Sequence, residues 1–278
     1  MRRLLAALML TLPNVGAAQE TCGAEDAACA LDGGTYRIEM PENAEGRPPA
    51  VLFLHGFGGS ADGTMRQGGM VNGLVDRGYA VIAPNGQARE GGGGLRWDFR
   101  PEEGRGSRDD DAFLIAVVED AVDRHEIDGD RVILGGFSNG AFLVYYLACR
   151  SPEAFAAYAP VSGGFWRPHP EDCAGPVRLF HTHGWSDSTV PLEGRPLRGG
   201  QWVQGDIFEG LTIWRAANGC DWADPDAYSE TGQFMRRRWE CGPGSALELA
   251  LFPGGHGVPD GWADMMLDWF EALPETES

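Results

Sequence analysis

The residues best suited to covalent chemistry lie in the segment Gly136-Phe137-Ser138-Asn139-Gly140. An apolar run, Arg131 to Leu134, precedes this segment, and a helical stretch, Ala141 to Leu147, follows it. A G-x-S-x-G motif between a strand and a helix is typical of a nucleophile elbow, a turn so tight that the positions beside the serine must be nearly free of side chain. The pattern predicts a nucleophilic serine hydroxyl held exposed above a helix N-terminus.

A nucleophilic serine needs a general base within hydrogen-bonding reach, and the base needs an acid to orient it. On α/β-hydrolase sheets these partners follow the serine in the order Ser, acid, His. Only His256, directly after the last predicted strand, satisfies this order. The other five histidines precede Ser138, lie in a proline-flanked loop or come too early to follow the acid: His55, His125, His169, His181 and His183. We expect His55 to shape its own loop through hydrogen bonds.

The predicted acid is Asp187, in the segment His183-Gly184-Trp185-Ser186-Asp187. It follows a predicted strand and precedes Val190-Pro191, which places it on the correct loop. Four other acids occupy the same interval of the chain: Glu193, Asp206, Asp221 and Asp224. The last two lie in a segment with Trp and Cys that is typical of a surface excursion.

An acyl-transfer site also needs two backbone N–H groups directed at the developing oxyanion. One is the amide of the residue after the nucleophile, Asn139. The other is expected from the turn His55-Gly56-Phe57-Gly58, and we assign it to Phe57.

Strands and helices alternate along the chain, which predicts an α/β fold, the α/β-hydrolase fold, with a mostly parallel sheet and helices on both faces. The predicted strands are 36–40, 50–54, 79–83, 131–134, 156–161, 177–180 and 246–252, and the predicted helices are 70–77, 109–126, 141–150, 208–217 and 262–273. We expect one catalytic domain over 33–278. Three aspartates, Asp109 to Asp111, are interpreted as a helix cap rather than a calcium site.

The start of the chain has the features of an export signal. Arg2 and Arg3 precede an apolar run, Leu4 to Leu12, and then Gly16-Ala17-Ala18, so we expect a signal peptide over 1–18 and a short Cys-bearing leader over 19–32. The apolar run is too short for a permanent membrane anchor. These features predict a secreted or periplasmic protein.

The cysteines agree with export, because an even number outside the cytosol indicates disulfides. Six cysteines allow fifteen pairings, of which we favour the nearest-neighbour set: Cys22–Cys29, Cys149–Cys173 and Cys220–Cys241. No C-x-x-C pair occurs, so we expect no metal site. A net charge of −19 argues against nucleic acid and anionic membranes as partners.

Several segments together resemble the secreted esterases grouped as polyhydroxybutyrate-depolymerase-like and feruloyl-esterase-like enzymes, relatives of carbohydrate esterase family 1. The resemblance covers roughly residues 33–272 and rests on these segments: Asp110–Ile115, Ile127–Val132, Gly136–Gly140, Phe155–Gly163, His55-Gly56, His183–Asp187, Pro191 and Gly254–His256. Relatives usually have a second glycine after the elbow, where this chain has Ala141. Depolymerases of solid polyester typically add a polymer-binding domain, so activity on crystalline polymer is not expected.

The resemblance implies a serine carboxylic ester hydrolase without cofactor, with Ser138, Asp187 and His256 as the triad. It also makes Trp97 and Trp185 candidate walls of the acyl pocket, and Phe137 lies nearby. The expected substrates are hydroxycinnamoyl (feruloyl-type) esters or short polyhydroxyalkanoate oligoesters. The alternatives are an acetyl-polysaccharide esterase, a serine peptidase of the same fold, or a secreted binding protein with a vestigial triad. The oligomeric state stays open.

Overall fold

The computed structural model describes residues 22–23, 27–42, 44, 46–89, 91–100 and 106–274. The predicted signal peptide, residues 1–18, and part of the leader lie outside the described residues. Within the described part of the chain, no helix is both long and apolar enough to cross a membrane.

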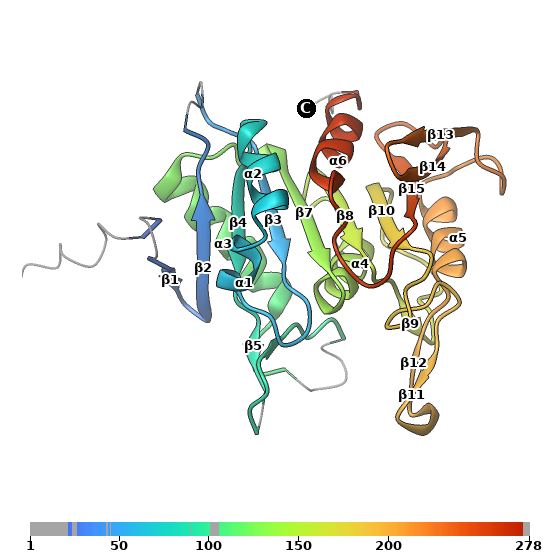
Figure 1. Cartoon of the computed structure of the whole chain (residues 1–278), viewed down its shortest axis with the longest axis horizontal. Helices are drawn as coiled ribbons and strands as arrows, with labels where there is room; N and C mark the ends of the chain where they lie inside the picture. Colours follow the sequence, from blue (N-terminus) through green and yellow to red (C-terminus); the bar gives the residue numbers. More distant parts are fainter. Residues whose placement is uncertain are drawn as a thin grey trace, which may run out of the picture.

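A ten-stranded sheet runs through the centre of the molecule, in the order β1-β2-β4-β3-β7-β8-β10-β15-β14-β13 (Figure 1). The six central strands, from β4 to β15, pair in parallel, whereas the two strands at each edge pair antiparallel. The strands are β1 (Cys29–Leu31), β2 (Gly34–Glu39), β3 (Ala50–Leu54), β4 (Ala80–Pro84), β7 (Val132–Phe137), β8 (Ala157–Val161), β10 (Arg178–Gly184), β13 (Ala227–Thr231), β14 (Phe234–Trp239) and β15 (Ala246–Phe252). This is the mostly parallel sheet of the α/β-hydrolase fold.

Helices cover both faces of the sheet because its central strands are apolar on both sides. The helices are α1 (Ala61–Met65), α2 (Gly68–Asp76), α3 (Asp110–His125), α4 (Asn139–Arg150), α5 (Ile207–Ala217) and α6 (Trp262–Glu271). The apolar sides of α2 and α6 form one core cluster with the sheet, and those of α3, α4 and α5 form another on the opposite face. Figure 1 shows α2 and α6 on one side of the sheet and α3 and α4 on the other.

Short strands form two smaller pairings outside the main sheet. A hairpin joins β5 (Gln87–Ala88) to β6 (Leu95–Arg96). A three-stranded sheet forms from β9 (Trp166–Arg167), β12 (Trp202–Gln204) and β11 (Pro196–Leu197).

The segment of Asp221 and Asp224, interpreted as a surface excursion, leads into β13 and β14, a hairpin that extends the main sheet beyond β15 and that was not predicted. The pattern of β14 concealed this strand: Arg236, Arg237 and Arg238 occupy its middle, so no alternation of apolar residues marks it. The guanidinium of Arg236 instead pairs with Glu248 on the neighbouring strand.

The three aspartates at the start of α3 each have a protein partner. The side chain of Asp109 accepts a hydrogen bond from Ala112 N at 3.1 Å and caps the helix, as predicted. Asp110 is buried and pairs with Arg108, and Asp111 pairs with Arg150. Their carboxylates therefore connect α3 to surrounding segments.

Three disulfides join the same pairs as the nearest-neighbour expectation: Cys22–Cys29, Cys149–Cys173 and Cys220–Cys241. Among the described residues, one set of three potential metal ligands lies close together, formed by Cys22, Cys29 and His125. Because its two cysteines are bonded to each other, they offer no thiolates to a metal.

Replacing both Cys149 and Cys173 by serine is expected to lower the free energy of unfolding by about 3 kcal/mol. This bond joins the end of α4 to the segment before β10 across a sequence separation of 24, so its loss gives the unfolded chain more freedom. Urea unfolding of the double variant beside the native protein measures the difference. A loss well below 1 kcal/mol would contradict the prediction.

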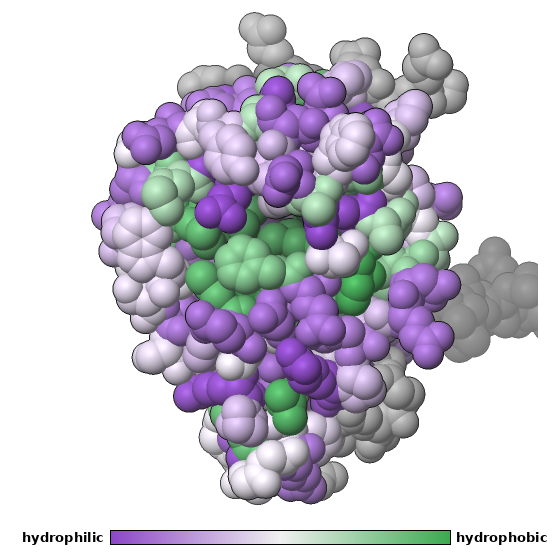
Figure 2. Space-filling view, turned by 90° about the vertical axis from the view of Figure 1, so that its right-hand side faces the viewer, coloured by the Kyte–Doolittle hydropathy of each residue, from purple (hydrophilic) through white to green (hydrophobic). Residues whose placement is uncertain are grey.

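The end of the sheet that carries α5 and the β13–β14 hairpin faces the viewer in Figure 2. Apolar side chains gather near the middle of this face, within a mostly polar surround. Exposed apolar or aromatic side chains on these elements include Phe208, Tyr228 and Met235.

Candidate active site

Ser138 lies at the turn between β7 and α4, with φ 55° and ψ −113°. Its positive φ is uncommon for a residue with a side chain and marks local strain, as expected for a nucleophile elbow. The glycines on either side have no room for a side chain. A Cβ on Gly136 would lie 2.8 Å from the carbonyl carbon of Gly140, and one on Gly140 would collide with the carbonyl oxygen of Leu54.

The loop after β15 brings His256 to Ser138. His256 Nε2 lies 2.9 Å from Ser138 Oγ, and His256 Nδ1 lies 2.7 Å from Asp187 Oδ2. An ionised carboxylate can only accept hydrogen bonds, so Nδ1 carries the proton and Nε2 is left to accept from the serine hydroxyl. This tautomer is the one that a general base requires.

The turn after β10 presents Asp187. Its second oxygen, Oδ1, accepts hydrogen bonds from the amides of Thr189 and Val190, both at 2.8 Å. Burial would raise the pKa of the Asp187 carboxyl, but the hydrogen bonds from His256, Val190 and Thr189 outweigh burial and lower its pKa below the usual value. Asp187 therefore stays ionised beside the imidazole at neutral pH.

The three side chains meet because β7, β10 and β15 are parallel. Parallel strands place their carboxyl ends at the same edge of a sheet, where ligands of α/β proteins usually bind. Each of the three residues follows the end of its strand within a few positions.

Two amides near the serine are free to donate. Asn139 N belongs to the first residue of α4, where no intrahelical acceptor exists. Phe57 N lies in the turn after β3, and within the described residues neither amide donates to a backbone acceptor. The neighbouring amides of this turn are occupied, since Gly58 N donates to Leu95 O and Gly59 N donates to Gly56 O.

The aromatic side chains expected around the site have different environments. Trp185 is 47% exposed, beside Asp187, and Phe57 is 57% exposed, with the Arg89 guanidinium 4.8 Å from its ring centre. Phe137 packs on the imidazole of His256, with the ring centres 4.6 Å apart. Phe57 and Trp185 can therefore meet a substrate, whereas Phe137 supports the base.

Trp97 does not line an open pocket as expected, because its side chain is only 1% exposed. The glycine-rich loop around it indicated a surface position, but its indole packs inward and donates from Nε1 to the carbonyl of His55 at 2.9 Å. Its backbone bonds to the side chain of Asn139. Trp97 belongs to the framework of the site.

The His55 side chain forms hydrogen bonds within its own loop and to the loop after β4, as expected for a residue that shapes its loop. Its Nε2 accepts from Gly86 N at 3.0 Å, so Nδ1 carries the proton and donates to Gly56 O at 2.8 Å. Burial lowers the pKa of His55 and keeps the ring neutral.

A buried chain of polar side chains behind Asp187 was not predicted. Tyr145 Oη lies 2.7 Å from His181 Nδ1, His181 Nε2 lies 3.0 Å from His183 Nδ1, and His183 Nε2 lies 2.8 Å from Val190 O. The final acceptor is a carbonyl, so each imidazole must donate from Nε2 and accept at Nδ1. The sequence did contain a signal for this contact: His181 and His183 are two residues apart on a strand, so their side chains lie on the same face and can bond to each other.

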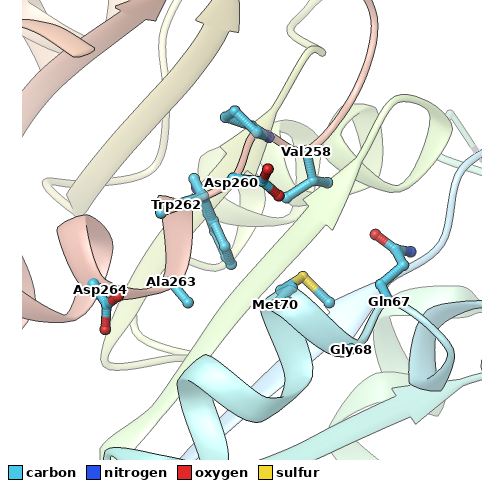
Figure 3. Close-up of a pocket in the computed structure, with 11 residues that line it drawn as sticks. Gln67, Gly68, Met70, Val258, Asp260, Trp262, Ala263 and Asp264 are labelled. Atoms are coloured by element: carbon cyan, nitrogen blue, oxygen red, sulfur yellow. The ribbon is translucent and has the colours of Figure 1, made fainter. Parts of the chain in front are cut away.

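A cleft of about 230 Å³ lies beyond His256, between the start of α2 and the segment that enters α6 (Figure 3). Gln67 and Met70 line one side, and Val258 and Trp262 line the other. None of Ser138, Asp187 or His256 lines this cleft or a second one near β14.

Comparison with known proteins finds a matching family model and several similar esterases. Residues 35–170 match the family Esterase PHB depolymerase. A protein named as an esterase, NocK of Nocardia uniformis subsp. tsuyamanensis, is 34% identical over 167 residues, which are 57% of this chain and 46% of that protein. Feruloyl esterase C of Emericella nidulans is 27% identical over 237 residues, which are 78% of this chain and 82% of that protein.

A solved structure shares the fold. The acetyl xylan esterase from Aspergillus awamori superposes with a TM-score of 0.64 at 19% identity, over 86% of this chain and 94% of that one. The chain spans about half the length, or less, of several curated relatives that it matches.

Proposed function

We propose that this chain, whose residues 35–170 match the family Esterase PHB depolymerase, is a serine carboxylic ester hydrolase that works through an acyl-enzyme. One observation carries the proposal: Ser138, His256 and Asp187 form a continuous hydrogen-bonded chain at the carboxyl ends of β7, β10 and β15. Because His256 Nδ1 donates to Asp187, His256 Nε2 is unprotonated and can accept the proton of the serine hydroxyl.

In the first step, Ser138 Oγ attacks the ester carbonyl carbon while its proton passes to His256 Nε2. The carbonyl electron pair moves to the oxygen, which the amides of Phe57 and Asn139 stabilise. When the tetrahedral intermediate collapses, His256 returns the proton to the leaving alkoxide and the alcohol departs. Water then repeats the sequence on the acyl-enzyme and releases the acid, which regenerates the Ser138 hydroxyl.

The proposed substrates are hydroxycinnamoyl esters or short polyhydroxyalkanoate oligoesters in solution. The named feruloyl esterase relative and the depolymerase family support these two classes. The exposed rings of Phe57 and Trp185, in the turns that carry the Phe57 amide and Asp187, offer apolar surface to either acyl group. Export is part of the proposal, since the three disulfides are typical of an oxidising compartment.

The test compares hydrolysis of methyl ferulate with that of a soluble 3-hydroxybutyrate oligomer, with the Ser138→Ala variant as the blank. Turnover of one ester that disappears in the variant is the expected result and identifies the acyl class. Turnover of neither ester above the blank would overturn both substrate classes. Acetylated xylan and a peptide amide in the same assay would then separate the acetyl esterase from the peptidase.

A further inference from the structure

The side chain of Asn139 forms a two-point contact with the backbone of Trp97. Trp97 N donates to Asn139 Oδ1 at 2.7 Å, and Asn139 Nδ2 donates to Trp97 O at 3.3 Å. An amide side chain is needed for such a contact, because it carries a donor and an acceptor side by side. Asn139 is 7% exposed, so water does not compete freely for these groups.

The same short segment also bonds on both sides of Phe57. The indole Nε1 of Trp97 donates to the carbonyl of His55 at 2.9 Å, and Leu95 O accepts from Gly58 N at 2.8 Å. The rings of His55 and Trp97 pack with their centres 5.0 Å apart. Residues 95–97 therefore connect the turn that carries the Phe57 amide to the helix start that carries the Asn139 amide.

We propose that the Asn139 side chain and Trp97 are positioning residues of the oxyanion hole, which set the Phe57 and Asn139 amides at a fixed separation. This inference rests on the proposed function. The two amides belong to different segments, the turn after β3 and the start of α4, and 82 positions separate them in the chain. An oxyanion hole stabilises the transition state because its N–H donors already point at the developing charge. If the two amides moved relative to each other, they would stabilise that charge less.

The contact acts on the transition state rather than on substrate binding. The ester carbonyl in the ground state carries little charge, and the amides bond strongly only to the oxyanion. Removal of the Asn139 side chain is therefore expected to lower kcat with little change in KM. If the contact only stabilised the fold, removing the Asn139 side chain would lower the melting temperature but leave kcat unchanged.

The chain contains a matched control for this test. Asn218 forms the same two-point contact with Val177, since Val177 N donates to Asn218 Oδ1 at 2.8 Å and Asn218 Nδ2 donates to Val177 O at 2.9 Å. Asn218 is 2% exposed and caps the end of α5, outside the proposed machinery. Asn218→Ala removes a comparable pair of buried hydrogen bonds, together with a longer one from Asn218 Nδ2 to Ala246 O at 3.3 Å.

The experiment measures kcat, KM and melting temperature for the native protein, Asn139→Ala and Asn218→Ala, with p-nitrophenyl acetate as substrate. It also measures inhibition by a phenylboronic acid, which adds to serine as a tetrahedral analogue. For Asn139→Ala we expect kcat to fall about 10- to 100-fold, KM to stay within about threefold and boronate affinity to fall with kcat. Asn218→Ala should have a lower melting temperature than the native protein but the same kcat and boronate affinity.

A second variant covers the case in which Asn139→Ala does not fold. Trp97→Phe keeps an aromatic ring and the backbone contacts but removes the Nε1 donor to His55, so kcat should fall while KM holds. Native kcat and boronate affinity in a folded Asn139→Ala or Trp97→Phe protein would overturn the positioning assignment. A native protein that neither hydrolyses esters nor reacts with a fluorophosphonate would instead overturn the proposed function and this inference together.

Discussion

Ser138→Ala is expected to lower kcat for ester hydrolysis by on the order of 10⁶-fold, because its hydroxyl is the group 2.9 Å from His256 Nε2. Alanine leaves the imidazole without a hydroxyl to deprotonate, so no acyl-enzyme can form. The measurement is kcat on p-nitrophenyl acetate together with labelling by a fluorophosphonate, which the variant should lose.

Ser188→Ala is the matched control for Ser138→Ala. Ser188 is an exposed serine in the turn beside Asp187, so its loss should change kcat by no more than about twofold. Circular dichroism of both variants tests whether they remain folded. If folded Ser138→Ala kept more than about 1% of native kcat, Ser138 would not be the nucleophile.

Asp187→Asn is expected to lower kcat by on the order of 10⁴-fold with little change in the fold. Asparagine can turn its NH₂ group toward His256 Nδ1, which then accepts and forces the ring proton onto Nε2. In that tautomer His256 cannot take the proton of Ser138. Steady-state kinetics of the purified variant measure the loss.

The control for Asp187→Asn is Glu193→Gln, which changes an exposed acid from the same interval of the chain. Glu193→Gln should keep native kcat. If the loss of activity followed Glu193 instead of Asp187, the acid would be misassigned.

The same aspartate should also affect stability in acid. The folded pKa of Asp187 lies below its unfolded value of about 3.9. Its contribution to the free energy of unfolding is therefore fully present above the unfolded pKa and is lost as pH falls through the folded pKa. Urea unfolding of native and Asp187→Asn protein between pH 3 and pH 7 should show a difference that is constant near neutrality and shrinks in acid. A difference unchanged down to pH 3 would contradict the lowered pKa.

The elbow and the main strands follow largely from local sequence. A Cβ on Gly136 would lie 2.8 Å from the carbonyl carbon of Gly140, four positions along the chain, so the motif carries part of its own geometry, whereas Gly140 is required by the close approach of Leu54 at the end of β3. The predicted strands 50–54 and 246–252 match β3 and β15 residue for residue, because strands buried on both faces need largely apolar sequence; Glu248 is the one charged residue in these two strands. The order Ser138, Asp187, His256 along the chain then selected which side chains meet at one edge of the sheet.

The contacts that hold these groups in place form between segments far apart in the chain. Trp97 lies in a glycine-rich stretch typical of a surface loop, yet contacts with His55 and Asn139, each 42 positions away, bury it. The Tyr145–His181–His183 chain likewise depends on α4 packing against β10. The two kinds of constraint act over different distances along the chain. Steric limits and hydrophobic periodicity act over a few residues, whereas these buried polar contacts form only when segments far apart in the chain pack together.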